Sequence, residues 1–285
     1  MALGAIYQLR VFTRDVTKAF VMSTTKLRRP VYMRAPGEMN VPSGTVLKVL
    51  KPLYGMPESP MHWFTTYVDY HRTSLDMEQV PFDPCLLFHR TDERLQGIVS
   101  LQVDDTLYAC TEEFAEKEEK VSTKFPSKGR TPIETEPVRY NGIDLHKIPH
   151  GYQMDQRTYI SEIPPISSKE DMSFEQFRSV RAKFAYAAYS TTPDVLVYVA
   201  HLAQYTEDRF ASEKVNALRV LKKLKKTIGT NPSTSGLKFV NFDPKNLEVV
   251  VCIDAAFAVN KDSTSQIGIV AMLRDKIRGD RKSVV

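Results

Sequence analysis

Residues 98–109 read IVSLQVDDTLYA, an apolar stretch interrupted by two adjacent carboxylates. Apolar residues stand on both sides of two adjacent carboxylates, a pattern typical of a buried β-hairpin with Asp104 and Asp105 near its tip. Unit charges about 4 Å apart repel by roughly 4 kcal/mol at an effective dielectric near 20, so ionising both acids requires a cation or a turn open to water. The pair therefore indicates a divalent metal site, and an ordinary hairpin turn, where Asp is common, is the alternative.

A third carboxylate, Asp15, stands at the end of another predicted strand. Residues 8–14 have the composition of a strand, and residues 15–20 are typical of a following helical turn. If the two predicted strands are neighbours, three carboxylates meet at their ends. That arrangement suits two-metal phosphoryl transfer, in which cations about 3.5–4 Å apart hold the attacking and leaving oxygens. Spacing alone leaves a purely structural role for these acids equally open.

The composition predicts a soluble globular protein of one large domain or two modest ones. The chain has 285 residues, of which 42% are hydrophobic, and its sequence predicts neither a membrane span nor a signal peptide. The cysteines, Cys85, Cys110 and Cys252, lie far apart, which fits a reducing compartment and argues against a zinc motif. A net charge of +5 is compatible with a polyanionic partner but does not identify one.

The remaining pattern predicts alternating strands and helices, with most of the helical residues between 174 and 228. A loop is expected at residues 126–137, and a linker at 229–236, where helix-stopping and small polar residues follow one another. Further strands are predicted at 31–36, 45–50, 138–145, 151–154, 237–240, 247–253 and 267–273, and helices at 61–75, 111–125, 174–189, 195–203 and 211–228.

A series of motifs in fixed order resembles copia-type retrotransposon reverse transcriptases. It consists of DVTKAF at 15–20, VYMRAP at 31–36, LKVLKPLYGMPESP at 47–60, DPC at 83–85 and QVDD at 102–105. The likeness continues through YNGI at 140–143, YI at 159–160, TTPDV at 191–195 and RVLKKLKKT at 219–227. It therefore covers nearly the whole chain.

This resemblance implies an α+β fold built around the palm of a right-hand polymerase. The palm would occupy residues 1–110, and residues 111–170 would form the end of the palm and the thumb. A helical connection and linker would follow at 171–235, and an incomplete RNase H-like α/β unit at 236–285. Only 14 residues precede Asp15, so the fingers region of the family is expected to be mostly absent. That expectation argues against polymerase activity of the isolated chain.

The resemblance also implies roles for the residues of the acid motifs. Asp15 and Asp104 would bind two Mg²⁺ ions, for which Mn²⁺ is a possible substitute, with the Val16 carbonyl helping and Asp105 supporting the site. One departure from the family is Gln102, which stands where an aromatic residue is usual two places before the acid pair. The metal chemistry does not depend on that position.

Aromatic and glycine residues near the acids would form the nucleotide site. By the resemblance, Phe20 would act as a gate against a ribose 2′-hydroxyl, and Tyr54 and Gly55 would border the incoming nucleotide. The alternative for Phe20 is a core aromatic residue one helical turn after a strand.

Three further sets of residues match family positions farther along the chain. Tyr140, Asn141 and Gly142 would form a primer grip, although a strand with a bulge explains that glycine equally well. On the basic helix, Lys222, Lys223 and Lys226 would contact phosphates, unless they simply form its solvated face. Asp254 would be the first metal ligand of RNase H, and because the other acids of that family come later, RNase H activity is not expected.

The implied function is RNA- or DNA-templated DNA synthesis within a retrotransposon polyprotein. Its partners would be a template with primer, a dNTP, and other polyprotein parts such as integrase and the rest of RNase H, without a membrane. Its location would be a cytoplasmic particle or the nucleus, not the secreted space. The rival interpretation is an inactive remnant that at most binds nucleic acid. An unrelated two-metal phosphohydrolase would explain the acids but not the Tyr54-Gly55 motif.

Overall fold

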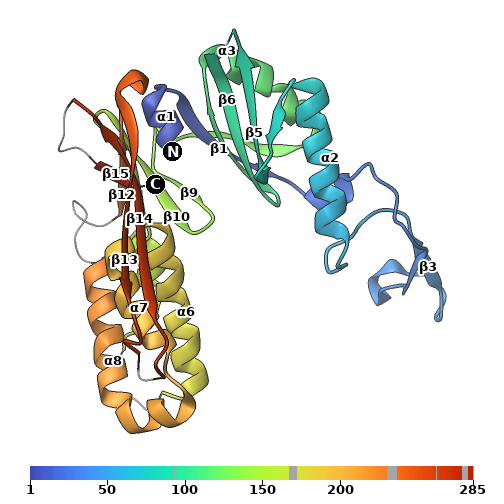
Figure 1. Ribbon diagram of the computed structural model, residues 1–285. Helices are drawn as coiled ribbons and strands as arrows, with labels where there is room; N and C mark the ends of the chain where they lie inside the picture. Colours follow the sequence, from blue (N-terminus) through green and yellow to red (C-terminus); the bar gives the residue numbers. More distant parts are fainter. Residues whose placement is uncertain (93, 167–171, 230–235, 261, 278–281, 285) are drawn as a thin grey trace. The chain divides into compact units, whose positions relative to one another are not determined.

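A computed structural model describes residues 1–92, 94–166, 172–229, 236–260, 262–277 and 282–284 (Figure 1). The chain divides into two compact units, one formed by residues 9–132 and the other by residues 1–8 together with 133–285. Both units combine helices with antiparallel strands, so the α+β class predicted from the sequence is confirmed.

Residues 9–132 form a six-stranded antiparallel sheet in the order β4-β5-β6-β7-β1-β8. Strand β1 lies between β7 and β8, although both follow it at a distance in the sequence. Its two edges are therefore hydrogen bonded, which holds the residues near its end in a defined register. The strands are β1 (Arg10–Val16), β4 (Glu78–Val80), β5 (Asp83–Thr91), β6 (Arg94–Gln102), β7 (Asp105–Cys110) and β8 (Ser127–Pro132).

Helices of this unit share a core with the sheet. They are α2 (Ser59–Ser74), α3 (Glu112–Glu118) and α4 (Lys120–Lys124). Trp63 and Tyr67 of α2 stack with ring centroids 4.7 Å apart, and both meet Phe125 edge-on at 5.3 Å. Across the sheet, Phe12 of β1 stacks on Tyr108 of β7 at 4.9 Å. Such pairs add about 0.5–1.5 kcal/mol beyond their buried area, so this core fixes the two strands that carry the predicted acids.

The segment between β1 and α2 forms a small ribbon. The 3₁₀ turn η1 (Ala19–Met22) leads to β2 (Val31–Arg34), η2 (Gly37–Met39) and β3 (Val46–Val49). Strands β2 and β3 pair antiparallel, from Val31 opposite Val49 to Arg34 opposite Val46, as a sheet of their own. The strands predicted at 31–36 and 45–50 are confirmed.

The other unit has a four-stranded sheet in the order β12-β11-β10-β9, together with a helical core. The capping box of Ser173 and Gln176 starts the long helix α6 by satisfying backbone donors at its first turn. The elements are α1 (Ala2–Ile6), β9 (Val138–Tyr140), β10 (Ile143–Ile148), β11 (Gly151–Asp155), α5 (Arg157–Ser161), α6 (Phe174–Ser190), η3 (Pro193–Val195), α7 (Leu196–Ala203), α8 (Glu207–Gly229) and β12 (Leu237–Val240).

A three-stranded sheet follows near the end of the described chain. It comprises β13 (Leu247–Ala256), β14 (Gln266–Asp275) and β15 (Lys282–Val284), preceded by η4 (Pro244–Asn246). Apolar side chains of β13 and β14 are widely exposed, with Val251 52%, Ile253 68% and Ile269 64% accessible. The two strands are therefore paired along their length while their apolar side chains face solvent.

The structure corrects several local predictions. The loop predicted at 126–137 contains β8, which pairs with β1. The helix predicted at 111–125 is divided in two at Glu119. The helix predicted from residue 211 begins at Glu207 and has non-helical dihedral angles at Glu213. Most of the predicted linker, residues 230–235, lies outside the described residues. In the part of the chain that is described, no helix is both long and apolar enough to cross a membrane.

Candidate functional site

Strands β1 and β7 bring the predicted acids together. In the register of this antiparallel pair, Asp15 lies directly opposite Asp105. Asp104 occupies the adjoining turn, and its carbonyl oxygen accepts a hydrogen bond of 3.0 Å from the Val16 main-chain N–H. Side chains of directly opposed residues in an antiparallel pair share one face of the sheet. The carboxylates of Asp15 and Asp105 are therefore neighbours, as the sequence predicts.

A hydrogen bond from helix α2 fixes the turn that carries Asp104. The indole Nε1–H of Trp63 donates a 2.6 Å hydrogen bond to the Val103 carbonyl, and the Trp63 side chain is buried. Val103 has a φ of 54°, a left-handed conformation that is unfavourable for a β-branched residue. Such a conformation costs about 1–3 kcal/mol and persists where its surroundings impose it. Pairing of the hairpin and the Trp63 contact impose it here.

The acids carry the electrostatic signature of a shared site. Burial raises the pKa of the Asp105 carboxyl, and the negative charges of Asp104 and Asp15 raise it further. The ammonium of Lys128 acts in the opposite direction on that pKa. Crowding of like charges that raises a pKa is a feature of sites that bind cations or protons.

Lys128 is a member of this site that sequence reasoning missed. Its Nζ lies 2.6 Å from Asp15 Oδ2, and the hydrogen bond and charge of Asp15 raise the pKa of the lysine. The two residues are partners in the register between β1 and β8. Lys128 falls in the segment predicted to be a loop, and a single lysine there gives no sequence signal of this contact.

The donors suit magnesium that is bound together with a phosphate ligand. Mg²⁺ in proteins is usually held by one or two carboxylates, several waters and substrate phosphates, rather than by a cage of protein ligands. Carboxylate oxygens are available from Asp15, Asp104 and Asp105. The ammonium of Lys128 forms an ion pair with the Asp15 carboxylate. Among the described residues, no group of three or more His, Cys, Asp and Glu side chains is gathered closely enough to hold a metal by itself.

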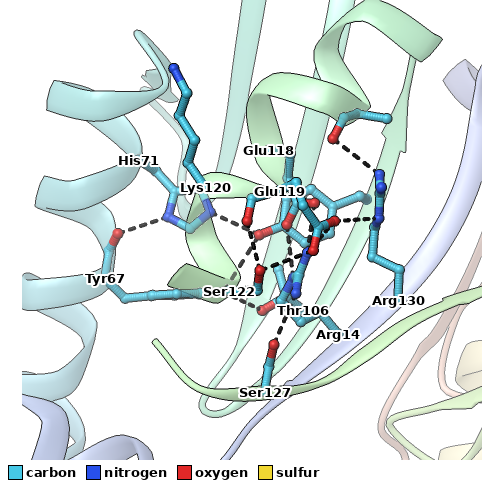
Figure 2. Close-up of polar contacts among 12 residues, drawn as sticks. Arg14, Tyr67, His71, Thr106, Glu118, Glu119, Lys120, Ser122, Ser127 and Arg130 are labelled. Atoms are coloured by element: carbon cyan, nitrogen blue, oxygen red, sulfur yellow. Dashed lines mark hydrogen bonds and ion pairs between the residues drawn. The ribbon is translucent and has the colours of Figure 1, made fainter. Parts of the chain in front are cut away.

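A buried ion pair supports β1 beside Asp15. Figure 2 shows Arg14 between Glu118 and Ser127, where its Nε and Nη2 atoms each donate a 2.9 Å bond to the Glu118 carboxylate. Both side chains are fully buried, and Arg14 Nη1 also donates to Ser127 Oγ at 2.9 Å. Burial lowers the pKa of Arg14, but the bonds and charge of Glu118 outweigh burial and raise it. The pair ties β1 to α3 and to the start of β8.

A histidine and two tyrosines form a second set of polar contacts in this unit, and Figure 2 labels His71 and Tyr67. His71 Nδ1 lies 2.8 Å from the Tyr67 carbonyl, which can only accept, so Nδ1 carries the proton. Nε2 then accepts from the Tyr108 hydroxyl at 3.0 Å. Burial lowers the pKa of His71 to about 4. The ring is therefore neutral at physiological pH and serves as a core hydrogen-bonding group rather than as a base.

The residues predicted for the nucleotide site also meet. The rings of Phe20 and Tyr54 lie with centroids 4.6 Å apart at an angle of 42°. Tyr54 is exposed, and Phe20 is partly buried against the core of the unit. Gly55 has a φ of 90°, a conformation that favours glycine, and a Cβ there would meet nothing within 4 Å. Phe20 thus combines core packing with a contact to an exposed aromatic ring.

An apolar pocket lies beside the acid turn. Its volume is about 260 Å³, and it is lined by Pro60, Met61, Trp63, Phe64, Tyr67, Cys85, Leu101, Gln102 and Val103. Gln102, the residue that departs from the family pattern, is one wall of this pocket.

The other predicted site residues lie in the unit formed with residues 133–285. Asn141 and Gly142 have φ values of 49° and 72° in the connection between β9 and β10, which is a two-residue hairpin turn rather than a bulge. The Tyr186 hydroxyl donates to the Asn141 carbonyl, and a Cβ at Gly142 would meet Tyr186 at 3.6 Å and Tyr159 at 3.7 Å. Tyr140 is the last residue of β9.

Helix α8 and strand β13 carry the remaining predicted residues. Lys222, Lys223 and Lys226 are exposed on α8, opposite the buried line of Leu218, Leu221 and Leu224. Lys223 Nζ lies 5.5 Å from the centre of the Tyr198 ring. Lys225 is a structural contact, because its ammonium donates to the carbonyls of Ile163 and Pro164. Asp254 is exposed on β13, opposite Gly268.

The chain belongs to the reverse transcriptase (RNA-dependent DNA polymerase) family, whose model matches residues 1–171. It is 30% identical over 109 residues to the retrovirus-related Pol polyprotein from transposon TNT 1-94 of Nicotiana tabacum, a match that covers 38% of this chain and 8% of that protein. These matches confirm the resemblance to copia-type reverse transcriptases. A foamy viral protease-reverse transcriptase solved in complex with dsDNA is similar over 100% of this chain and 52% of that one, with 13% identity and a TM-score of 0.49. The chain thus spans only part of each of these proteins.

Proposed function

We propose that residues 9–132 carry the catalytic carboxylates of a polymerase that performs RNA- or DNA-templated DNA synthesis as part of a retrotransposon polyprotein. The observation that carries this proposal is the pairing of Asp15 with Asp105 beside the Asp104 turn. Family membership supports it, because reverse transcriptases use divalent metal ions.

In this proposal Asp15 and Asp104 hold two Mg²⁺ ions, or Mn²⁺ in their place, with help from the Val16 carbonyl. Asp105, whose pKa is raised by its neighbours, supports the site through its charge. Bound magnesium supplies charge stabilisation for in-line attack of a primer 3′-hydroxyl on the α-phosphate of a dNTP, with release of pyrophosphate. The Trp63 contact and the buried Arg14–Glu118 pair keep the carboxylate-bearing backbone in place for that geometry.

The aromatic pair beside the acids is the proposed nucleotide site. Phe20 would exclude a ribose 2′-hydroxyl by standing under the sugar, and Tyr54 and Gly55 would border the nucleotide. The contact between Phe20 and Tyr54 supports this role, because Tyr54 limits the positions open to the Phe20 ring. The open space at Gly55 leaves room for a ligand close to the backbone.

The other unit would handle the strands of the primer and template. We propose the Tyr140-Asn141-Gly142 turn as the primer grip and Lys222, Lys223 and Lys226 as phosphate contacts, because these groups are arranged at a hairpin tip and on an exposed helical face. Asp254 would belong to the start of an RNase H-like unit. The palm, thumb, connection and RNase H assignments, the partnership with integrase, and a location in a cytoplasmic particle or the nucleus belong to the same proposal.

A second candidate is a retroelement remnant without catalysis. Two observations favour it. Lys128 forms an ion pair with Asp15, and among the described residues no three His, Cys, Asp or Glu side chains are placed to hold a metal ion. In such a remnant the acids would be neutralised internally and the basic helix would at most bind nucleic acid.

Primer extension on an RNA template with Mg²⁺ separates the two candidates. The proposed polymerase function predicts that the folded chain extends the primer although most of the fingers region is expected to be absent, and that Asp104→Asn abolishes extension. Asp69→Asn is the matched control, because it removes one charge from the exposed face of α2 in the same unit. A folded parent chain that binds primer and template but does not extend the primer would establish the remnant instead.

A further inference from the structure

Strand pairing brings Lys128 to the acid site. Lys128 and Asp15 are register partners in the pairing of β8 with β1, and their charged atoms lie 2.6 Å apart. The hydrogen bonds of the sheet hold the two backbones opposite each other, just after a register shift between Thr13 and Asp15. The fold therefore places the Lys128 side chain within reach of the Asp15 carboxylate.

The backbone under Lys128 is fixed while its side chain is exposed. Ser127, the preceding residue, pairs with Val16 and accepts a hydrogen bond from Arg14. One residue earlier, the Pro126 carbonyl accepts a 2.8 Å bond from the Thr17 N–H. The Lys128 side chain itself is 81% exposed. Its ammonium can therefore leave Asp15 by side-chain rotation without any change in the sheet.

We propose that Lys128 is the resident counter-ion of Asp15. Its ammonium neutralises the carboxylate when no divalent cation is bound and competes with that cation for the same oxygen, so Lys128 sets the metal affinity of the site. This inference rests on the proposed function, in which Asp15 is a metal ligand. Lys128 is thus a positioning residue, which acts through Asp15 rather than on the reacting atoms.

The ion pair between Lys128 and Asp15 is weak enough for a divalent cation to compete with the ammonium for the carboxylate. Exposed ion pairs are weak, so a divalent cation can displace the ammonium. Removal of a positive charge beside three carboxylates favours a divalent ion both by freeing an oxygen and by ending like-charge repulsion. A purely structural surface pair would instead leave metal affinity unchanged when the lysine is replaced.

The chain contains a built-in reporter for the test. Trp63 is the only tryptophan, and its indole is bonded to Val103 next to the acid turn. We would titrate the full chain with Mn²⁺ and follow Trp63 fluorescence, which needs no polymerase activity. Lys128→Arg keeps the charge, Lys128→Met removes it and Lys128→Glu reverses it. Lys120→Met is the matched control, because this exposed lysine of α4 contributes only its backbone carbonyl to a bond with Tyr70.

We expect Mn²⁺ to bind Lys128→Met roughly two- to fivefold more tightly than the parent, and Lys128→Glu more tightly still. Lys128→Arg and Lys120→Met should match the parent, and the differences should shrink at high salt. Equal affinities across the series, with binding still lost in Asp104→Asn, would overturn the counter-ion role and leave the proposed metal site standing. Absence of any Asp104-dependent binding in the parent and the Lys128 variants would overturn both.

Discussion

Two sheets of this protein each carry a carboxylate that the family resemblance marks as a metal ligand, but among the described residues only the six-stranded sheet pairs that carboxylate with another one. In the six-stranded sheet, Asp15 meets Asp105 because β1 is drawn between β7 and β8, and a core of aromatic rings fixes those strands. In the three-stranded sheet, Asp254 lies on an exposed hairpin opposite Gly268. A single carboxylate in a sequence motif therefore does not define a site, because other charged side chains must be brought beside it by long-range strand pairing.

The largest expected difference between the sheets concerns their ion pairs. Arg14→Met leaves the Glu118 carboxylate buried without its partner and should lower the free energy of unfolding by about 3–5 kcal/mol. Arg274→Met breaks the pair between β14 and Glu248 of β13, which is 41% and 28% exposed, and should cost about 1 kcal/mol or less. Urea denaturation followed by Trp63 fluorescence and by circular dichroism measures both.

A double variant distinguishes the buried charge from general damage to the core. Arg14→Met combined with Glu118→Leu removes both charges and should recover most of the stability lost in the single variant. Equal losses in the single and double variants, or in Arg14→Met and Arg274→Met, would contradict this account of the two sheets.

The second difference is the pH dependence that His71 gives to the six-stranded unit. The pKa of His71 is about 4 in the folded protein against 6.5 in an unfolded chain, so the unfolded state binds more protons between these values. The contribution of neutral His71 to the free energy of unfolding, roughly 3 kcal/mol, is therefore fully present above pH 6.5 and is lost as the pH falls toward 4. Trp63 fluorescence reports this unit, and the unfolding free energy should decline from pH 6.5 to 5.

His71→Gln is the control for that dependence. The variant lacks the titrating ring, so its stability should change less with pH over the same interval, whatever its absolute stability. A parent protein whose stability is flat from pH 6.5 to 5, or a variant with the same slope, would show that His71 is not buried as a neutral ring.

The third and smallest difference compares one substitution in both sheets. Val99 of β6 is 0% exposed, whereas Val251 of β13 is 52% exposed. Val99→Thr buries a hydroxyl in the core and should cost about 1–3 kcal/mol, and Val251→Thr should change stability by no more than about 0.5 kcal/mol. Thermal denaturation compares the two variants. A large loss in Val251→Thr would mean that the face of β13 is covered in solution.

Much of the candidate site could be predicted because its signals are local. Asp15 follows a predicted strand, and Asp104 and Asp105 interrupt an apolar run. The contact of Phe20 with Tyr54 agrees with their shared assignment to the nucleotide site. These features depend on patterns within a few residues or on motifs in fixed order.

The rest depends on contacts that no local pattern encodes. Strand β8 reads SKGRTP, which lacks apolar alternation, and it becomes a strand because β1 offers an unpaired edge. The placement of Lys128 on Asp15 follows from that pairing. Arg14 and Glu118 look like ordinary surface charges in the sequence, and only the packing of α3 on the sheet buries them together.

Binding of Mn²⁺ tests the central claim most directly, because it asks which sheet holds a metal. Electron paramagnetic resonance of free Mn²⁺ would compare the parent with Asp15→Asn, Asp104→Asn and Asp254→Asn. We expect the first two variants to bind at least about tenfold more weakly and Asp254→Asn to match the parent. Weakened binding in Asp254→Asn, with Asp15→Asn and Asp104→Asn unchanged, would contradict the assignment of the metal site to the six-stranded sheet.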